Sequence, residues 1–203
     1  MASQSGAPVA GGQSMAKLAN LPNFLTMLRI AAIPVIVWLL QDPSPRAATI
    51  TFFVYIAASF TDFLDGYVAR RYGLTTVIGQ MLDPLADKLL VVSALVMLAL
   101  IDRSPSIPAW LLVIIIGREL AVTGLRSIAA TEGIVLGAEA SGKLKMLLQS
   151  IAVPGLILHY TYFGISFHTV GFLTLLAATA VGLWSAVEYH VAVFRQMGGG
   201  PRE

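Results

Sequence analysis

Apolar residues dominate six long stretches of the chain, at about residues 24–41, 46–71, 76–101, 108–130, 142–164 and 169–194. Each stretch is close to or above the roughly 20 residues that a helix needs to cross about 30 Å of hydrocarbon. Turn-forming residues separate the stretches, among them the segment Asp42-Pro43-Ser44-Pro45 and the pair Tyr72-Gly73. The pattern predicts an all-α membrane protein in which six transmembrane helices form one bundle.

The two ends of the chain lack apolar runs. Residues 1–14 are rich in glycine, serine and alanine and have no apolar core of the kind that a signal peptide carries. We expect residues 1–14 and 198–203 to be disordered tails on either side of a membrane domain at 15–197. The segment 15–22, just ahead of the first stretch, is expected to form a short interfacial helix.

Basic residues are distributed unevenly between the two sides of the predicted bundle. One side carries only Arg46 and Arg103. The other side carries Lys17, Arg70, Arg71, Lys143, Lys145, Arg195 and Arg202. Because lysine and arginine accumulate on the cytoplasmic side of membrane proteins, both termini are predicted to be cytoplasmic.

Composition supports a membrane protein and excludes other classes. The chain is 57% hydrophobic and 12% charged, whereas soluble domains are roughly 45–50% apolar and about 25% charged. It has no cysteine, so a metal site would have to use carboxylates rather than thiolates. The net charge of +2 is small and its basic residues are scattered, which argues against a nucleic-acid partner.

Four aspartates interrupt the second and third apolar stretches. An ionised group inside a membrane costs several kcal/mol unless it is paired, hydrated or metal-bound. Asp62 and Asp65 are three residues apart, and Asp83 and Asp87 are four apart, so each pair lies on one face of its helix. The connection between the two helices is short, which predicts antiparallel neighbours with the four carboxylates at similar depth.

Convergent carboxylates repel one another unless cations neutralise them. Mg²⁺ or Mn²⁺, with their preference for oxygen ligands, would do so, and two ions could share the four groups. Gly66, Ala69 and Gly79 leave room near the acidic faces for a large group, and Arg70 offers a cation for phosphate oxygens. These residues predict a metal-assisted diphosphate site.

The acidic segment resembles the signature of the CDP-alcohol phosphotransferase family. All eight fixed positions match, in the arrangement Asp62-x2-Asp65-Gly66-x2-Ala69-Arg70-x8-Gly79-x3-Asp83-x3-Asp87. The segments LPNFLTMLR at 21–29, GRELAVTGLR at 117–126 and GKLK at 142–145 resemble the bacterial phosphatidylglycerophosphate synthases, a branch of that family. The resemblance covers about residues 21–149.

The resemblance implies a homodimeric six-helix enzyme of the bacterial inner (plasma) membrane, with its site open to the cytoplasmic leaflet. It implies transfer of the phosphatidyl group from CDP-diacylglycerol to glycerol 3-phosphate, giving phosphatidylglycerol phosphate and CMP. Asp62, Asp65 and Asp83 would be metal ligands, and Asp87 would be both ligand and base. The residues implied to line the CDP pocket are Asn23, Thr26, Arg29, Gly66, Ala69, Arg70 and Gly79.

Arg118 is a further charged residue within an apolar stretch. It lies about 15 Å along the predicted helix 108–130, near the middle of the membrane. With Arg126, Lys143 and Lys145 it would form a basic pocket for a second, phosphorylated substrate. Under the resemblance, that substrate is glycerol 3-phosphate.

Structural roles are the alternatives for these charged residues. The aspartates could form a buried ion-pair network with Arg70, Arg71 and Lys88. Arg118 could make a salt bridge to Glu119 or to an aspartate that only holds the bundle together. Arg126, Lys143 and Lys145 could be anchors at the cytoplasmic surface.

Two other functions are compatible with membrane-embedded carboxylates. A cation transporter would place them along a path open to both sides, but here the outer half of the predicted bundle has none. Other members of the resembled family use serine, inositol phosphate or phosphatidylglycerol as the acceptor, and the signature alone does not distinguish these alcohols.

Overall fold

The computed structural model describes residues 11–72, 77–102, 104–134 and 140–198, with backbone alone for 11–23, 62–72, 77–81, 83–84 and 198. It is mostly helical, which confirms the predicted all-α class. The helices are α1 (Gly11–Leu39), α2 (Pro45–Tyr72), α3 (Val77–Leu100), α4 (Ala109–Thr131), α5 (Ala140–Leu158) and α6 (Phe167–Gly198). Two short strands, β1 (Thr161–Tyr162) and β2 (Ile165–Ser166), lie between α5 and α6.

The observed helix ends lie close to the predicted ones for α2, α3 and α4. Helix α1 begins at Gly11 and runs without a break through 15–22, so residues 11–14 are helical and the expected interfacial segment continues into the first apolar stretch. The remainder of the expected tails, 1–10 and 199–203, lies outside the described residues. Helix α5 ends at Leu158, earlier than the predicted boundary at 164.

A β-hairpin replaces the end of the predicted fifth helix. His159 has a φ of 36°, which ends the helix, and the two residues of the hairpin loop, Phe163 and Gly164, have φ values of 54° and 78°. Positive φ at both loop positions is the pattern of a tight two-residue hairpin. The strands pair in antiparallel register, with Thr161 opposite Ser166 and Tyr162 opposite Ile165. The hydropathy pattern did not predict these strands, because they are short and continue an apolar segment.

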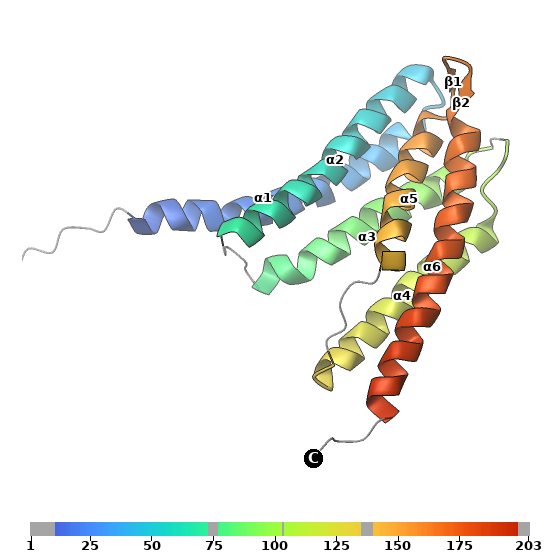
Figure 1. Cartoon of the computed structure of the whole chain (residues 1–203). Helices are drawn as coiled ribbons and strands as arrows, with labels where there is room; N and C mark the ends of the chain where they lie inside the picture. Colours follow the sequence, from blue (N-terminus) through green and yellow to red (C-terminus); the bar gives the residue numbers. More distant parts are fainter. Residues whose placement is uncertain (1–10, 73–76, 103, 135–139, 199–203) are drawn as a thin grey trace, which may run out of the picture.

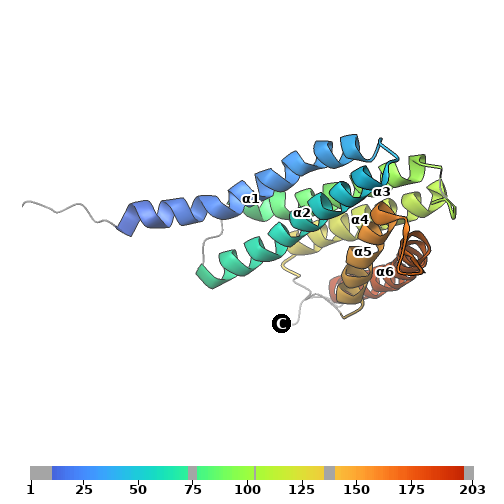
Figure 2. The same ribbon diagram turned by 90° about the horizontal axis from the view of Figure 1, so that it is seen from above.

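Successive helices alternate in direction, so their connections gather at two ends of the molecule (Figure 1). Hydrogen bonds join three connections at one end, which we call the closed end. The Tyr160 hydroxyl donates to the Pro43 carbonyl at 2.7 Å, and His168 Nε2 lies 2.7 Å from the Pro105 carbonyl. Toward the opposite end, α1, α2 and α3 diverge from α6 (Figure 1). Helix α1 packs against both α2 and α3, and α5 packs along α6; from above, α5 and α6 lie side by side at one edge (Figure 2).

The apolar core occupies the closed end. It joins the end of α1, the middle of α2, the end of α3, the start of α4, the end of α5 and the start of α6. Its fully buried members include Ile36, Leu95, Leu98, Leu111, Leu156, Ile157 and Leu175. Toward the opposite end a smaller apolar cluster, Ala129, Tyr189 and Val193, joins the ends of α4 and α6.

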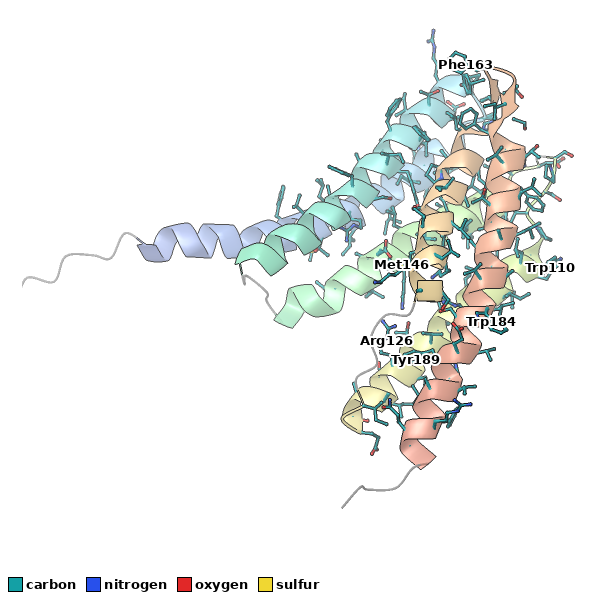
Figure 3. All side chains as sticks on the ribbon, viewed as in Figure 1. Trp110, Arg126, Met146, Phe163, Trp184 and Tyr189 are labelled. Atoms are coloured by element: carbon teal, nitrogen blue, oxygen red, sulfur yellow. The ribbon has the colours of Figure 1, made fainter. Side chains whose placement is uncertain are left out.

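Large apolar side chains are exposed on every helix. Trp38 is 70% exposed, Val113 69% and Leu120 69%, and Trp110 and Trp184 point away from the bundle (Figure 3). Such an outer surface suits lipid rather than water. By length and hydropathy over the described residues, one helix, Phe167–Met197, is a candidate membrane span, and Phe24–Leu39 is a shorter apolar segment. The count of six spans stays a prediction.

Helices α5 and α6 approach each other most closely at two glycines. A Cβ atom on Gly171 would lie 2.7 Å from the Leu156 nitrogen and 2.9 Å from the Ala152 carbonyl oxygen, and a Cβ on Gly155 would lie 3.1 Å from the Gly171 Cα. Glycine at such crossings lets helix backbones touch, as is common between membrane helices. The α5–α6 contact thus depends on the absence of a side chain at position 171.

We predict that Gly171→Ala destabilises the protein, because the added methyl group overlaps backbone atoms that cannot move independently. Overpacking of this kind costs about 1–3 kcal/mol, and the apparent Tm in detergent should fall by several degrees. The measurement is the fraction of protein that remains monodisperse by size-exclusion chromatography after heating. The matched control is Gly124→Ala, whose new Cβ meets nothing within 4 Å. Equal melting temperatures for the two variants would contradict the prediction.

Candidate active site

The four signature aspartates lie on the end of α2 and the start of α3. From the helix ends at Tyr72 and Val77, their positions are about 9–15 Å along each helix. Because α2 and α3 run in opposite directions on either side of a short connection (Figure 1), the four positions occupy one level. The side chains of Asn23, Asp62, Asp65, Gly66, Ala69, Arg70, Gly79 and Asp83 lie outside the described part of the structure, so their roles stay predictions.

Asp87 is the one signature aspartate whose side chain is described, and it is half-buried on α3. Its carboxylate interacts electrostatically with the phenol of Tyr55, which is buried on α2 and shares a hydrogen bond with Ser59. Position 62 is two helical turns beyond Tyr55, on the same face of α2. This face of α2 is therefore turned toward Asp87, as the predicted convergence of the acidic pairs requires.

Tyr55 is a residue that the sequence reasoning missed. Its spacing of seven from Asp62 marks a shared helix face, and this signal was available in the sequence. However, tyrosine within an apolar stretch is common, and only the position of Asp87 on α3 distinguishes Tyr55 from a core residue.

Helix α1 contributes a cation to the same region. Arg29 is fully buried, and its Nε donates to the Ala58 carbonyl of α2 at 3.3 Å. Ala58 is one turn before position 62. Thr26, one turn before Arg29 on α1, is also buried. Two of the three residues predicted to contribute from the first helix, Thr26 and Arg29, thus lie on its inner face, beside the acidic segment of α2, while their contact with a nucleotide stays a prediction.

The carboxylates supplied by the end of α2 and the start of α3 are suitable ligands for a hard divalent cation. Within the described residues there is no group of three or more histidine, cysteine, aspartate or glutamate side chains close enough to share a metal ion, and three of the four signature carboxylates lie outside that set. The sequence supplies carboxylate oxygens here and has no cysteine at all. Oxygen donors of this kind suit Mg²⁺ or Mn²⁺.

A second charged cluster joins α4, α5 and α6, and we call it the cation cluster: Arg118, Glu119 and Lys145. Their side chains are only 11%, 15% and 13% exposed. Oε1 of Glu119 accepts from Arg118 NH1 at 2.5 Å and from Lys145 Nζ. Arg118 Nε donates to the Gly182 carbonyl of α6 at 2.9 Å. The salt bridge considered as an alternative for Arg118 is present, and it brings Arg118 and Lys145 together.

The cation cluster adjoins the acidic site. Lys145 interacts electrostatically with Asp87, and Glu119 does so with Lys88. Lys88, the residue after Asp87, donates through Nζ to the Thr123 hydroxyl, one turn beyond Glu119 on α4. With Asp62, Asp65 and Asp83 outside the described side chains, the groups described here comprise three cations and two carboxylates, a surplus of one positive charge beside Asp87. An anionic group is the ligand that would balance it.

The other two predicted basic residues have different surroundings. Arg126 is exposed and its guanidinium lies 5.5 Å from the centre of the Tyr189 ring on α6, a cation–π contact (Figure 3). Lys143 is exposed near the start of α5. The structure thus groups Arg118 with Lys145 and places Arg126 against Tyr189. The predicted roles of Arg126 and Lys143 in binding stay predictions.

A small, partly open pocket lies beside the cation cluster, between α4, α5 and α6. Its wall is largely apolar and includes Ile115, Leu175 and Leu183, while Arg118, Glu119, Lys145 and Gln149 contribute polar groups. A pocket with apolar walls and a few charged groups can orient a small polar ligand, because the charges dominate binding where water is excluded.

Comparison with known proteins adds evidence that is independent of this geometry. The profile of the CDP-alcohol phosphatidyltransferase family matches residues 19–185. A Bacillus subtilis protein named CDP-diacylglycerol--glycerol-3-phosphate 3-phosphatidyltransferase is 41% identical over 184 residues, which cover 85% of this chain and 90% of that protein. A Rickettsia bellii protein of the same name is 44% identical over 139 residues, 68% of this chain and 75% of its own length. A rice protein named cardiolipin synthase (CMP-forming) is 36% identical over 193 residues, 88% of this chain and 59% of its own length.

Proposed function

This chain belongs to the CDP-alcohol phosphatidyltransferase family, and on that premise we propose that it transfers the phosphatidyl group of CDP-diacylglycerol to glycerol 3-phosphate. The products are phosphatidylglycerol phosphate and CMP. The names of the bacterial relatives support this acceptor. In the structure, the proposal is supported by the position of Lys145, which interacts with Asp87 and shares the carboxylate of Glu119 with Arg118. This arrangement provides cations for a phosphorylated acceptor near the signature acids.

The proposed reaction is one displacement at phosphorus. A free hydroxyl of glycerol 3-phosphate attacks the β-phosphorus of CDP-diacylglycerol, a new P–O bond forms, and the bond to the bridging oxygen breaks so that CMP leaves. Asp87 accepts the hydroxyl proton. Arg118 and Lys145 bind the acceptor phosphate and hold the hydroxyl near Asp87.

Asp62, Asp65, Asp83 and Asp87 would hold one or two divalent cations. When bound, Mg²⁺ or Mn²⁺ would neutralise charge on the diphosphate as CMP leaves. Thr26, Arg29 and the small residues of α2 and α3 would then line the space for the nucleotide. The buried guanidinium of Arg29 beside α2 supports a contribution from α1.

We further propose that the bundle spans the bacterial inner membrane six times as a homodimer, with the active site at the cytoplasmic side. The exposed apolar side chains on every helix support spanning. The even number of helices and the concentration of basic residues away from the closed end support cytoplasmic termini.

Cardiolipin formation is the second candidate, favoured by the match to the rice cardiolipin synthase. Its acceptor would be phosphatidylglycerol rather than glycerol 3-phosphate. An acceptor panel with purified protein, assayed by CMP release, separates the two functions.

We predict that Asp87→Asn and Asp62→Asn abolish CMP release, because each removes a carboxylate from the set that holds the divalent cation, and Asp87 is also the base. Chelation of divalent metal should have the same effect and added Mg²⁺ or Mn²⁺ should reverse it. The matched control is Asp102→Asn, in the exposed α3–α4 connection at the closed end, which should retain activity. Wild-type rates in Asp87→Asn, or in chelator, would refute the metal role.

We predict that Arg118→Ala raises the KM for glycerol 3-phosphate by roughly ten- to two-hundred-fold, since the loss of one charged hydrogen bond to phosphate costs about 1.5–3 kcal/mol. Arg126→Ala should have a smaller effect, because Arg126 contacts Tyr189 rather than the cation cluster. Steady-state kinetics with each substrate varied in turn provides the measurement. A mutant with impaired use of CDP-diacylglycerol and normal use of glycerol 3-phosphate would assign Arg118 to the other substrate.

We predict that the hairpin tip is outside the cell and the end of α6 inside. The natural sequence has no cysteine, so single cysteines report position without background. Phe163→Cys, at a fully exposed position, should react with a membrane-impermeant maleimide in intact cells. Gln196→Cys, exposed near the end of α6, should react only after permeabilisation. The reverse pattern would overturn the proposed orientation.

A further inference from the structure

We propose that Glu119 and Gly182 are positioning residues, which hold Arg118 and Lys145 in the arrangement that binds the acceptor phosphate. This inference rests on the proposed function, because it concerns the same substrate. Neither residue binds the phosphate itself: Glu119 is an anion, and Gly182 has no side chain.

Glu119 holds two cations together that would otherwise repel each other. Arg118 is on α4 and Lys145 on α5, and both side chains are almost excluded from water, which strengthens the repulsion between them. A single oxygen, Glu119 Oε1, accepts hydrogen bonds from both. The two positive groups are therefore fixed around one point instead of turning toward separate solvent-exposed positions.

The hydrogen bonds to the shared carboxylate do not use all the N–H donors that Arg118 and Lys145 can offer to a ligand. A guanidinium has five N–H donors and an ammonium three. The bonds to Glu119 and to the Gly182 carbonyl fix the orientation of Arg118 and Lys145 without using all these donors. Because two cations face one carboxylate, the cluster also retains a positive charge for phosphate oxygens. Glu119 thus determines where the cations lie and does not neutralise both of them.

Gly182 supports the cluster from α6 in two ways. Its carbonyl accepts from Arg118 Nε at 2.9 Å. A Cβ at this position would lie 3.3 Å from Lys145 Cγ and 3.6 Å from Arg118 Nε, so the stem of Lys145 and the guanidinium of Arg118 lie against the bare backbone. A larger side chain at position 182 would displace both cations from the pocket that adjoins them.

The expected kinetic signature separates positioning from a general structural role. Glu119→Gln preserves the size of the side chain and removes its charge, and it should raise the KM for glycerol 3-phosphate by about tenfold while the KM for CDP-diacylglycerol changes less than about twofold. Glu119→Asp, which keeps the charge, should recover part of the loss. Gly182→Val should raise the same KM, and Gly182→Ala should do so less because its closest new contact is 3.3 Å. The matched control is Ala180→Val, on an exposed face of the same helix, which should leave both KM values unchanged.

A double-variant comparison tests whether Glu119 acts through the cations. In an Arg118→Ala, Lys145→Ala background, the further change Glu119→Gln should have almost no effect on the KM for glycerol 3-phosphate, because neither of the two cations that Glu119 positions remains. A full tenfold effect in that background would overturn the inference.

The outcomes distinguish this inference from the function on which it rests. If the wild-type protein releases no CMP with glycerol 3-phosphate, the proposed function fails and the inference fails with it. If the wild type is active and Glu119→Gln leaves the KM for glycerol 3-phosphate unchanged or lowers it, only the positioning role is wrong. A lowered KM would mean that Glu119 competes with phosphate for the cations. Should Glu119→Gln or Gly182→Val not yield monodisperse protein, Glu119→Ala, which also removes the charge, and Gly182→Ala provide the comparison, and an unchanged KM for glycerol 3-phosphate in both would overturn the inference.

Discussion

Charge compensation inside an apolar bundle is the constraint on which the rest of this structure depends. A buried cation or carboxylate without a partner costs several kcal/mol, and the described interior charges meet this requirement in different ways. Arg29 donates to a backbone carbonyl of α2, and Lys88 donates to Thr123. Glu119 accepts hydrogen bonds from both Arg118 and Lys145. The contacts of Arg29 with α2, of Lys88 with α4 and of Lys145 with Glu119 each cross from one helix to another. The same interactions that make the charges tolerable therefore determine which helix faces meet.

The largest apolar core and the charged groups of the bundle occupy different levels along the helices. At the closed end, apolar side chains from all six described helices pack together, and hydrogen bonds from Tyr160 and His168 reach the connections that contain Pro43 and Pro105. Toward the other end α1, α2 and α3 diverge from α6 (Figure 1), and the apolar core is reduced to a small cluster between α4 and α6. The charged side chains of the cation cluster lie between these two apolar clusters. Anchoring at one end lets α2, α3 and α4 present polar residues to a shared space without loss of the fold. Enzymes commonly place reactive groups on rigid elements in this way.

The sequence alone was sufficient to predict the helices, but it did not predict all of the residue contacts within the site. Hydropathy and turn residues locate helix ends because both properties are local, and the bounds of α2, α3 and α4 agree closely with expectation. The hairpin before α6 was not predicted, since its strands are short and lie within an apolar segment. The convergence of Arg118 and Lys145 was expected, but the contact of Arg118 with Gly182 was not: these residues are 64 positions apart. A glycine in an apolar helix carries no sign of which side chain rests against it.

A preference for a phosphorylated acceptor follows from the balance of charges in the proposed site. The described groups around Asp87 leave a surplus of positive charge in a region with little water, and an anionic ligand relieves this surplus. A neutral alcohol would leave Arg118 and Lys145 with unsatisfied donors, and a buried unpaired donor costs about 1–3 kcal/mol, more when it is charged. The site would then discriminate between acceptors less by attracting a phosphorylated alcohol than by the free-energy penalty for binding a neutral one. Because Glu119 neutralises only one of its two cations, it keeps the cluster stable when empty and still charged enough to select an anion.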